Sequence, residues 1–439
     1  MAQAGLGRVS LLAFAASVAT MIPPLLILFF VRQHGVDIPF WDDWDETPLV
    51  VAFYHGTLTF ADLWAPHNEH HILTSRLTLF GLDLLLHGGN SVSRIFIGIV
   101  AALLTLGGLV VLAFRLLDER SALILTAVFS AILFSSAQFE NWVWGFQIGW
   151  FYVNAALVWS IVLLSNRTRR WESFVFAAFL GASATASLAS GLVVWVADFV
   201  PIALVPSRDR IPRALGWAGL TVAATVIFFA GRPSSGISPS HELAYIAPVL
   251  GYSLTFLGSP VFGWLGNPGM AIAGAVVVGV SMLICVAVAR DLDRARAMRA
   301  LPWMTLVAFA FADAAITAFG RAVIGIDQAG SSRYVTVSQL AWIGMIGVVA
   351  VYWPVFVGRA RYAALGVGFL SAIAFVADQQ HFGPAFEGAT TEMGIVRSAI
   401  LSGTATDAQL QTIYPNAAAE RRYIEELRSV GEGPLGTRP

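Results

Sequence analysis

Lysine is absent from this sequence, cysteine occurs once, and charged residues make up only 12% of the 439 positions. The single cysteine, Cys285, lies in an apolar run, so the chain can form neither an internal disulfide nor a zinc site built from several thiolates. The 26 arginines and 27 acidic residues leave a net charge of -1. This charge balance excludes the broad basic surface that would displace counterions from nucleic acid phosphates, so no nucleic acid partner is expected.

Apolar residues, in contrast, are abundant. They make up 57% of the sequence, and the mean hydropathy is +0.72. Soluble domains contain about 45–50% apolar and about 25% charged residues, so this composition is typical of a membrane protein. A helix needs about 20 apolar residues to cross the hydrocarbon layer. The sequence therefore predicts an all-α polytopic membrane protein with eleven transmembrane helices, at 10–32, 91–115, 121–138, 148–165, 173–190, 191–206, 214–230, 268–289, 301–319, 335–357 and 362–378.

Arginine placement predicts the direction of these spans. Arginines cluster in the short segments 115–120, 167–170, 208–213, 290–299 and 359–361, whereas the long segment 33–90 holds only one. Because positive residues concentrate on the cytoplasmic side, we expect a cytoplasmic N-terminus and an extracytoplasmic C-terminus in the inner (cell) membrane of a bacterium. Residues 1–378 would form the transmembrane domain. Residues 379–439 would form a small outer tail with a helix from about Asn416, its N-cap, to Val430.

Titratable residues gather in the predicted first outer loop, 33–90, which holds or adjoins six of the eight histidines. The loop opens with the acidic-aromatic motif Trp41 to Glu46. Packed carboxylates raise one another's pKa, which can tune one of them as a base, although a solvated acidic turn is the alternative. Thr47 to His55 is expected to form a short helix. The apolar stretch Ile72 to Leu86 is too short to span and is expected to lie along the membrane interface.

A second polar cluster follows at Pro66-His67-Asn68-Glu69-His70-His71. Proline is favoured at the first position of a helix, and a helix starting at Pro66 would place His67 and His71 on one face, with His70 adjacent. Such spacing could hold a divalent metal or place imidazolium groups against a phosphate or a sugar. The polar start of an interfacial helix is the third interpretation. Two histidines without a third ligand define no metal site, so no metal ligands are assigned and a divalent metal stays an open alternative.

An acidic motif after the first span, an outer loop with two interfacial helices and then many spans together resemble the GT-C class of membrane glycosyltransferases. That class includes the protein O-mannosyltransferases and the bacterial aminoarabinose and arabinofuranosyl transferases. The resemblance is carried by Pro39 to Glu46 and by Tyr54-His55-Gly56. The chain departs from better-known members in its tandem Asp42-Asp43, in its Asn-Glu-His-His cluster and in lacking a large soluble C-terminal domain.

The resemblance implies a GT-C-like fold and an inverting transfer of sugar from a polyprenyl-phosphate-linked donor to a hydroxyl of a glycan, lipid or protein acceptor. One of Asp42, Asp43 and Asp45 would be the catalytic base. Apart from the resemblance, the residue types and spacing of the two clusters make the following residues the expected substrate contacts: Trp41, Trp44, His67, Asn68, Glu69, His70 and His71.

The departing phosphate needs cationic stabilisation, for which arginine is well suited. Arg321 and Arg333, with Tyr334 beside it, lie in a predicted outer segment and are the expected phosphate-binding residues, although each arginine could simply snorkel to the interface. A transporter or flippase of a lipid-linked sugar is the second hypothesis, and a non-catalytic scaffold is the third. A transporter would need ionisable residues along its spans and repeated halves. Only Asp198 and Asp313 lie at membrane depth and no repeat is visible, so the transferase is preferred.

Overall fold

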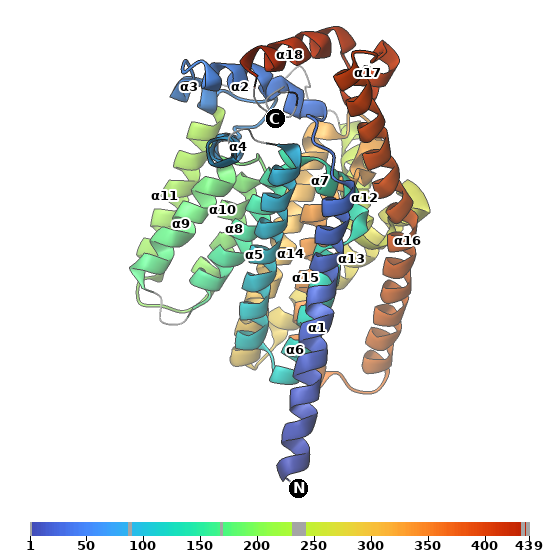
Figure 1. Cartoon of the computed structure of the whole chain (residues 1–439). Coiled ribbons are helices and arrows are strands. Elements are labelled where there is room, and N and C mark those ends of the chain that lie inside the picture. The colour runs from blue at the N-terminus through green and yellow to red at the C-terminus, as the bar shows by residue number, and fades with distance from the viewer. Residues whose placement is uncertain (1, 87–89, 167–169, 231–242, 432–434, 436–439) are drawn as a thin grey trace.

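A computed structural model describes residues 2–86, 90–166, 170–230, 243–431 and 435. Within these residues the regular structure is helical, apart from one isolated bridge between His67 and His70. Figure 1 shows a bundle of long helices. These are α1 (Ala2–His34), α5 (Ser91–Leu116), α6 (Glu119–Leu133), α8 (Ile148–Leu164), α9 (Trp171–Thr185), α10 (Gly191–Leu204), α11 (Arg210–Phe229), α12 (Ile246–Phe262), α13 (Gly266–Arg290), α14 (Arg294–Arg321), α15 (Val335–Tyr352) and α16 (Arg359–Ser402).

Eight segments of the described residues are long and apolar enough to cross a membrane. They are Leu11–His34, Ser91–Leu116, Glu119–Val143, Gly145–Leu164, Arg210–Phe229, Leu243–Arg290, Arg294–Arg321 and Ser332–Val355. Large apolar side chains such as Phe14, Phe176 and Phe179 are exposed on the outside of the bundle, where lipid tails would cover them. The chain is therefore an all-α, multi-span membrane protein whose surroundings are a lipid bilayer.

The helix boundaries differ from the predicted spans at several places. The predicted spans 173–190 and 191–206 fall on α9 and α10, which have only 15 and 14 residues. α10 does begin at Gly191, where a Cβ atom would collide with the backbone of Ala184. The predicted span 121–138 lies within the candidate span Glu119–Val143, although the helix α6 itself ends at Leu133, where the chain turns. The predicted span 362–378 lies within α16, which continues unbroken to Ser402.

The apolar segment after residue 243 forms a helix that packs closely against the next one. α12 and α13 are joined by the short turn η5 (Gly263–Leu265) and form a hairpin. Gly258 of α12 lies against the carbonyl oxygen of Met270, and Gly274 of α13 lies against that of Leu254. A side chain at either glycine would overlap with backbone, so these residues allow the close approach of the two helices.

Replacing Gly258 by alanine is therefore expected to destabilise the protein by about 1–3 kcal/mol, because the added methyl group forces the two helices apart. Gly279 is the matched control, since a Cβ there meets nothing within 4 Å. In detergent, Gly258→Ala should unfold at a clearly lower temperature than the wild type, whereas Gly279→Ala should unfold at the wild-type temperature. Equal behaviour of the two variants would show that the hairpin is not held by this contact.

One end of the bundle is capped by shorter helices from both ends of the chain. The first loop contributes η1 (Trp41–Glu46), α2 (Thr47–Tyr54) and α3 (Phe60–Trp64), and the C-terminal part contributes α17 (Asp407–Ile413) and α18 (Ala417–Val430). We call this end, formed by residues 35–86 and 403–431, the loop face. It lies opposite the N-terminus, and α16 carries the chain up to it (Figure 1).

The predicted helix 47–55 and the C-terminal helix are confirmed. α2 ends before Gly56, and α18 has Asn416 as its N-cap and Gly431 after its last residue. α4 (Leu73–Leu86) lies across the direction of the long helices in Figure 1. It exposes Leu77, Leu84 and Leu85, as expected for a helix along the membrane interface.

α18 covers α2 with an amphipathic face that contains one carboxyl group. Ala417, Glu420, Ile424 and Leu427 are buried along this face. Both carboxyl oxygens of Glu420 are buried and have no hydrogen-bond partner among the residues that the structure describes. Burial raises the pKa of Glu420 to about 8, against a smaller lowering by Arg421. The helix α2 carries no charged side chain, and Asp407 of α17 is already paired with Arg421.

Docking of α18 should therefore weaken as the pH rises. The released helix would lose the Glu420 proton near its ordinary pKa of 4.5, whereas the docked helix keeps it up to about pH 8. The contribution of protonated Glu420 to the free energy of docking is complete below pH 4.5. It decreases between pH 4.5 and pH 8 and is lost above pH 8. Proteolysis within α17 and α18 should accelerate up to about tenfold per pH unit in that window. Glu420→Gln should abolish this dependence, while Glu425→Gln, an exposed site on the same helix, should retain it.

Candidate functional site

The acidic motif forms η1, a single 3₁₀ segment that runs directly into α2. Its two tryptophans differ in environment. Trp44 is fully buried and anchors η1 in the core, whereas Trp41 is 41% exposed and has a positive φ of 47°. Of the two predicted substrate contacts, only Trp41 is therefore at the surface. The four carboxylates of the motif also differ in environment. Asp43 and Glu46 are buried, whereas Asp42 and Asp45 are partly accessible.

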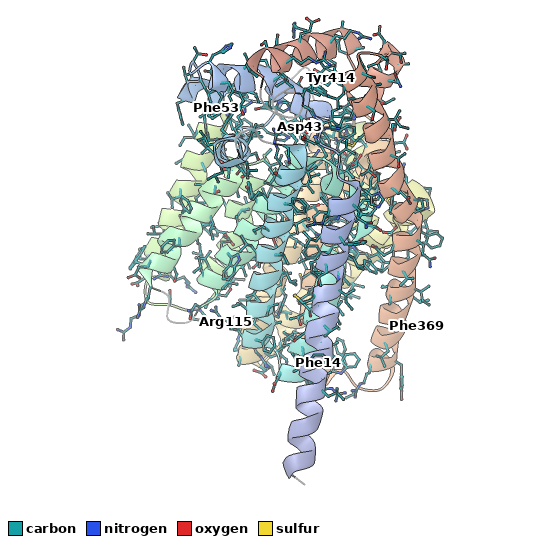
Figure 2. All side chains as sticks on the ribbon, viewed as in Figure 1. Phe14, Asp43, Phe53, Arg115, Phe369 and Tyr414 are labelled. Carbon is teal, nitrogen blue, oxygen red and sulfur yellow. The ribbon has the colours of Figure 1, made fainter. Side chains whose placement is uncertain are left out.

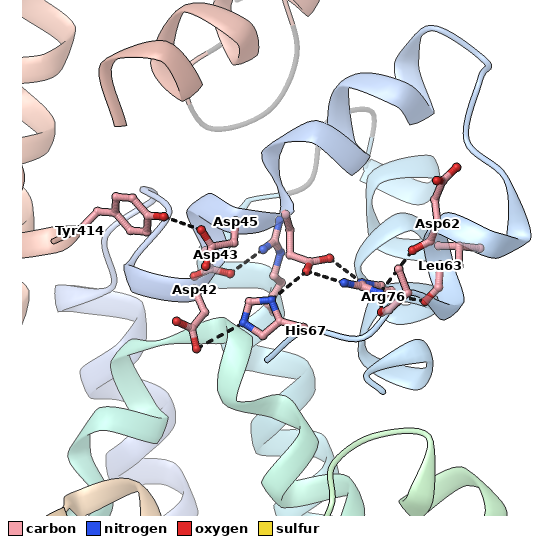
Figure 3. A network of polar contacts seen from close by, with 11 residues as sticks. Asp42, Asp43, Asp45, Asp62, Leu63, His67, Arg76 and Tyr414 are labelled. Carbon is pink, nitrogen blue, oxygen red and sulfur yellow. Dashed lines mark hydrogen bonds and ion pairs between the residues drawn. The ribbon is translucent and has the colours of Figure 1, made fainter. Parts of the chain in front are cut away.

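The two buried carboxylates are neutralised by two arginines from other helices. Asp43 accepts a hydrogen bond from Arg94 of α5 at 2.8 Å. Glu46 accepts two from Arg76 of α4, at 2.7 and 2.9 Å (Figure 3). Burial raises the pKa of Asp43 to about 6, with Arg94 opposing the rise. Burial also favours a higher pKa for Glu46, but His67 and Arg76 together hold it below its ordinary value.

His67 lies between the accessible and the buried carboxylates. Its Nε2 is 3.6 Å from Asp42 Oδ2, and its Nδ1 is 3.5 Å from Glu46 Oε1. Burial alone would lower the pKa of His67, but Asp42 and Glu46 outweigh it and raise the pKa to about 9. The ring also contacts Phe146, at 5.0 Å between centroids. His67 is thus enclosed by acidic groups on the side that faces η1.

The predicted helix starting at Pro66 is wrong. Residues 67–70 form a tight turn in which the backbones of His67 and His70 exchange two hydrogen bonds, and Asn68, which is exposed, has a positive φ of 50°. The helix begins only at Leu73. One cause is Arg76, which donates to the carbonyl oxygen of Ala65, the group that would accept the first hydrogen bond of a helix starting at Pro66.

Without that helix, the histidines separate. His71 is buried, stacks on Trp64 at 4.4 Å between centroids and donates from Nδ1 to the carbonyl oxygen of Trp64 at 2.7 Å. His70 accepts a hydrogen bond from the backbone of Ala189, in the turn between α9 and α10. Only His67 therefore faces the acidic motif, and the expected pairing of His67 with His71 on one face does not occur.

Asp42, Asp45 and His67 come together as one cluster. One ligand atom from each lies within 4.8 Å of the others, a spacing that could hold a metal ion. Asp45 also accepts a hydrogen bond from the hydroxyl of Tyr414, which follows α17 (Figure 3). The C-terminal part of the chain thus helps to position a carboxylate of the first loop.

The two predicted phosphate-binding arginines occupy different places. Arg321, at the end of α14, forms an ion pair with Glu69 of the first loop, which is also 3.7 Å from His70. Arg333 lies in η7 (Ser332–Tyr334), where its backbone N–H donates to Glu140 and its guanidinium lies over the ring of Tyr334. Among the described residues, Arg333 has no hydrogen bond or ion pair with the first loop. Tyr334 is buried beside Trp150.

A small cavity touches the ion-pair network. It is lined in part by Glu46, Ser75, Arg76, Arg94 and Phe146, and its volume is about 20 Å³. This is enough for a single water molecule. A sugar headgroup would need the site to open beside it.

Sequence reasoning missed Arg76, Arg94, Tyr414 and the pairing role of Glu46. One signal was present, because Arg76 is the only arginine in an acidic loop and a buried carboxylate needs a cation. Tyr414 gave no such signal, since it lies 369 residues after Asp45.

Comparison of this chain with protein-family models, with curated proteins and with solved structures finds no match. The fold and the site define a multi-span α-helical membrane protein with an acidic-histidine cluster at its loop face.

Proposed function

We propose that this protein is an inverting membrane glycosyltransferase, which moves a sugar from a polyprenyl-phosphate-linked donor to an acceptor hydroxyl at the extracytoplasmic face. One observation carries the proposal. Asp43 and Glu46 are neutralised by arginines, whereas no arginine contacts Asp42 or Asp45 within the described residues. A carboxylate that is buried against an arginine is poorly placed to take a proton from a substrate hydroxyl, so Asp42 and Asp45 are the base candidates and Asp43 has a structural role.

The position of the cluster also supports this chemistry. η1 follows α1 after only a few residues, and α4 lies across the bundle at the same end. A lipid-linked donor carries its phosphate at headgroup depth, where this end of the bundle would lie. Arg321 is the nearest phosphate-binding candidate, because it already contacts Glu69 of the first loop. The donor phosphate would compete with Glu69 for this guanidinium, and separation of that pair would open the site.

The orientation rests on the arginine distribution. Arg115 lies at the end of the bundle opposite to Asp43 and Tyr414 (Figure 2). Arg120 lies in the first turn of α6, which begins just after α5 ends, and Arg290 and Arg294 lie at the connection between α13 and α14, at the end of α14 remote from Arg321. Positive residues favour the cytoplasm, so the loop face would be extracytoplasmic, in a bacterial inner membrane.

The proposal is tested with the purified full-length protein in liposomes that contain the polyprenyl-phosphate-linked sugars, and also the glycans, lipids and proteins that could accept the sugar, all extracted from the envelope of the producing cell. Release of polyprenyl phosphate is the expected result. A folded protein that releases none from any of these lipids would overturn the proposal.

A transporter or flippase of a lipid-linked sugar is the second candidate. It is favoured by Asp198 of α10 and Asp313 of α14, two ionisable side chains that are completely buried in the bundle. In the same liposomes, movement of the lipid-linked sugar between leaflets without release of polyprenyl phosphate would support this candidate instead.

A further inference from the structure

The cluster of Asp42, Asp45 and His67 has the spacing of a metal site. One ligand atom from each residue lies within 4.8 Å of the other two. Ligands bound at about 2.0–2.2 Å to one ion lie up to about 4 Å apart, so side-chain movements of less than an ångström would bring all three into coordination.

His67 supplies an independent sign of a ligand. Its side chain is only 8% exposed, and its buried Nε2 is within ion-pair distance of Asp42 but has no hydrogen-bond partner among the described residues. A buried polar nitrogen without a partner is uncommon in folded proteins. This nitrogen is directed toward Asp42, 3.6 Å away, and on the other side of the ring Nδ1 lies 3.5 Å from Glu46. A carboxylate behind the distal nitrogen is the usual way in which a metal-binding imidazole is oriented.

The charge of the site also calls for a cation. The motif contributes four carboxylates, and the two arginines in contact with it, Arg76 and Arg94, balance two of them. Of the two negative charges that remain, on Asp42 and Asp45, a protonated His67 balances one when no ion is bound. A divalent ion would balance both while leaving His67 neutral, which is the form in which imidazole coordinates metals.

We infer that Asp42, Asp45 and His67 bind one divalent transition-metal ion, either Mn²⁺ or Zn²⁺. One imidazole nitrogen with two carboxylate oxygens suits these ions, whereas Mg²⁺ and Ca²⁺ prefer oxygen ligands alone. Three protein ligands leave open coordination positions for water or an oxygen of a bound anion. The binding site stands on geometry that does not depend on the proposed sugar transfer, although a donor phosphate would be a natural occupant of the open position.

The test uses Mn²⁺ and the full-length protein in detergent, without any sugar donor. Electron paramagnetic resonance titration should show one tightly bound Mn²⁺ per chain. The electron spin-echo modulation of this ion should contain the coupling of one imidazole nitrogen. His67→Gln should remove that coupling, and His67→Gln or Asp45→Asn should weaken binding ~100-fold or more, beyond the loss seen when only an outer-shell partner is removed.

Asp62→Asn is the matched control, because Asp62 belongs to the same loop but binds Thr59 and lies outside the cluster. This variant should bind Mn²⁺ as the wild type does. Zn²⁺ should displace Mn²⁺ from the wild type and from Asp62→Asn alike. Absence of stoichiometric binding to the wild type, or bound Mn²⁺ without nitrogen coupling, would overturn the inference even if a variant failed to fold. Failure of sugar transfer by a protein that binds the ion would count against the proposed function alone.

Discussion

Substitution of Arg76 by methionine is expected to reduce the free energy of unfolding by about 3–5 kcal/mol, the usual cost of removing one partner of a buried ion pair. Arg76 is 4% exposed and donates two hydrogen bonds to Glu46. It also donates to three backbone carbonyls of residues 62–65. The variant would leave the Glu46 carboxylate buried beside His67 alone and would leave those carbonyls without this donor.

Thermal unfolding in detergent measures this loss. Arg421→Met is the control, because Arg421 and Asp407 form an ion pair whose side chains are 48% and 71% exposed, and such pairs contribute little. The double variant Arg76→Met with Glu46→Gln should recover part of the stability, since it removes the uncompensated charge. If Arg76→Met unfolds at the same temperature as Arg421→Met, the ion pair does not hold the first loop in place.

Replacing Asp42 or Asp45 by asparagine is expected to slow sugar transfer by about 10²–10⁴-fold, the range typical of a lost general base. Both side chains are partly accessible, and neither contacts an arginine in the described part of the chain. Asparagine keeps the size of the side chain but can neither accept the hydroxyl proton nor supply the negative charge. Stability should change little.

Asp43→Asn is the informative comparison, because Asp43 is the neighbouring carboxylate but is buried against Arg94. Its loss should lower the unfolding temperature, since the buried guanidinium loses its counterion. Transfer by the fraction that remains folded should be close to normal. Wild-type rates in a variant that carries both Asp42→Asn and Asp45→Asn would show that the acidic motif does not supply the base.

Hydropathy and capping signals were sufficient for much of the fold. The long apolar runs correspond to helices, and the ends of α18 follow directly from Asn416 and Gly431. These features depend on local chemistry, which a sequence displays. The α9–α10 pair and the helix α12 were harder to place, because helices of 14–17 residues are too short to be distinguished as spans by length alone.

The site was predictable only in part. The sequence indicated the acidic motif and His67, but the histidine spacing was misread because contacts distant in sequence decide the backbone there. Arg76 lies 30 residues from Glu46, and its hydrogen bond to the carbonyl oxygen of Ala65 competes with the first hydrogen bond of a helix starting at Pro66. A local sequence pattern does not indicate which carboxylate will pair with a distant arginine. Only the folded structure therefore distinguishes Asp43 and Glu46, which pair with arginines, from Asp42 and Asp45.

The most direct measurement of the central claim is mass spectrometry of membrane lipids from cells that contain either the wild-type protein or the Asp42→Asn, Asp45→Asn double variant as their only copy. If the cluster transfers sugar from a polyprenyl phosphate, the variant cells should accumulate one glycosylated polyprenyl phosphate that the wild type consumes. Identical lipid profiles, with both proteins present at equal levels in the membrane, would contradict it.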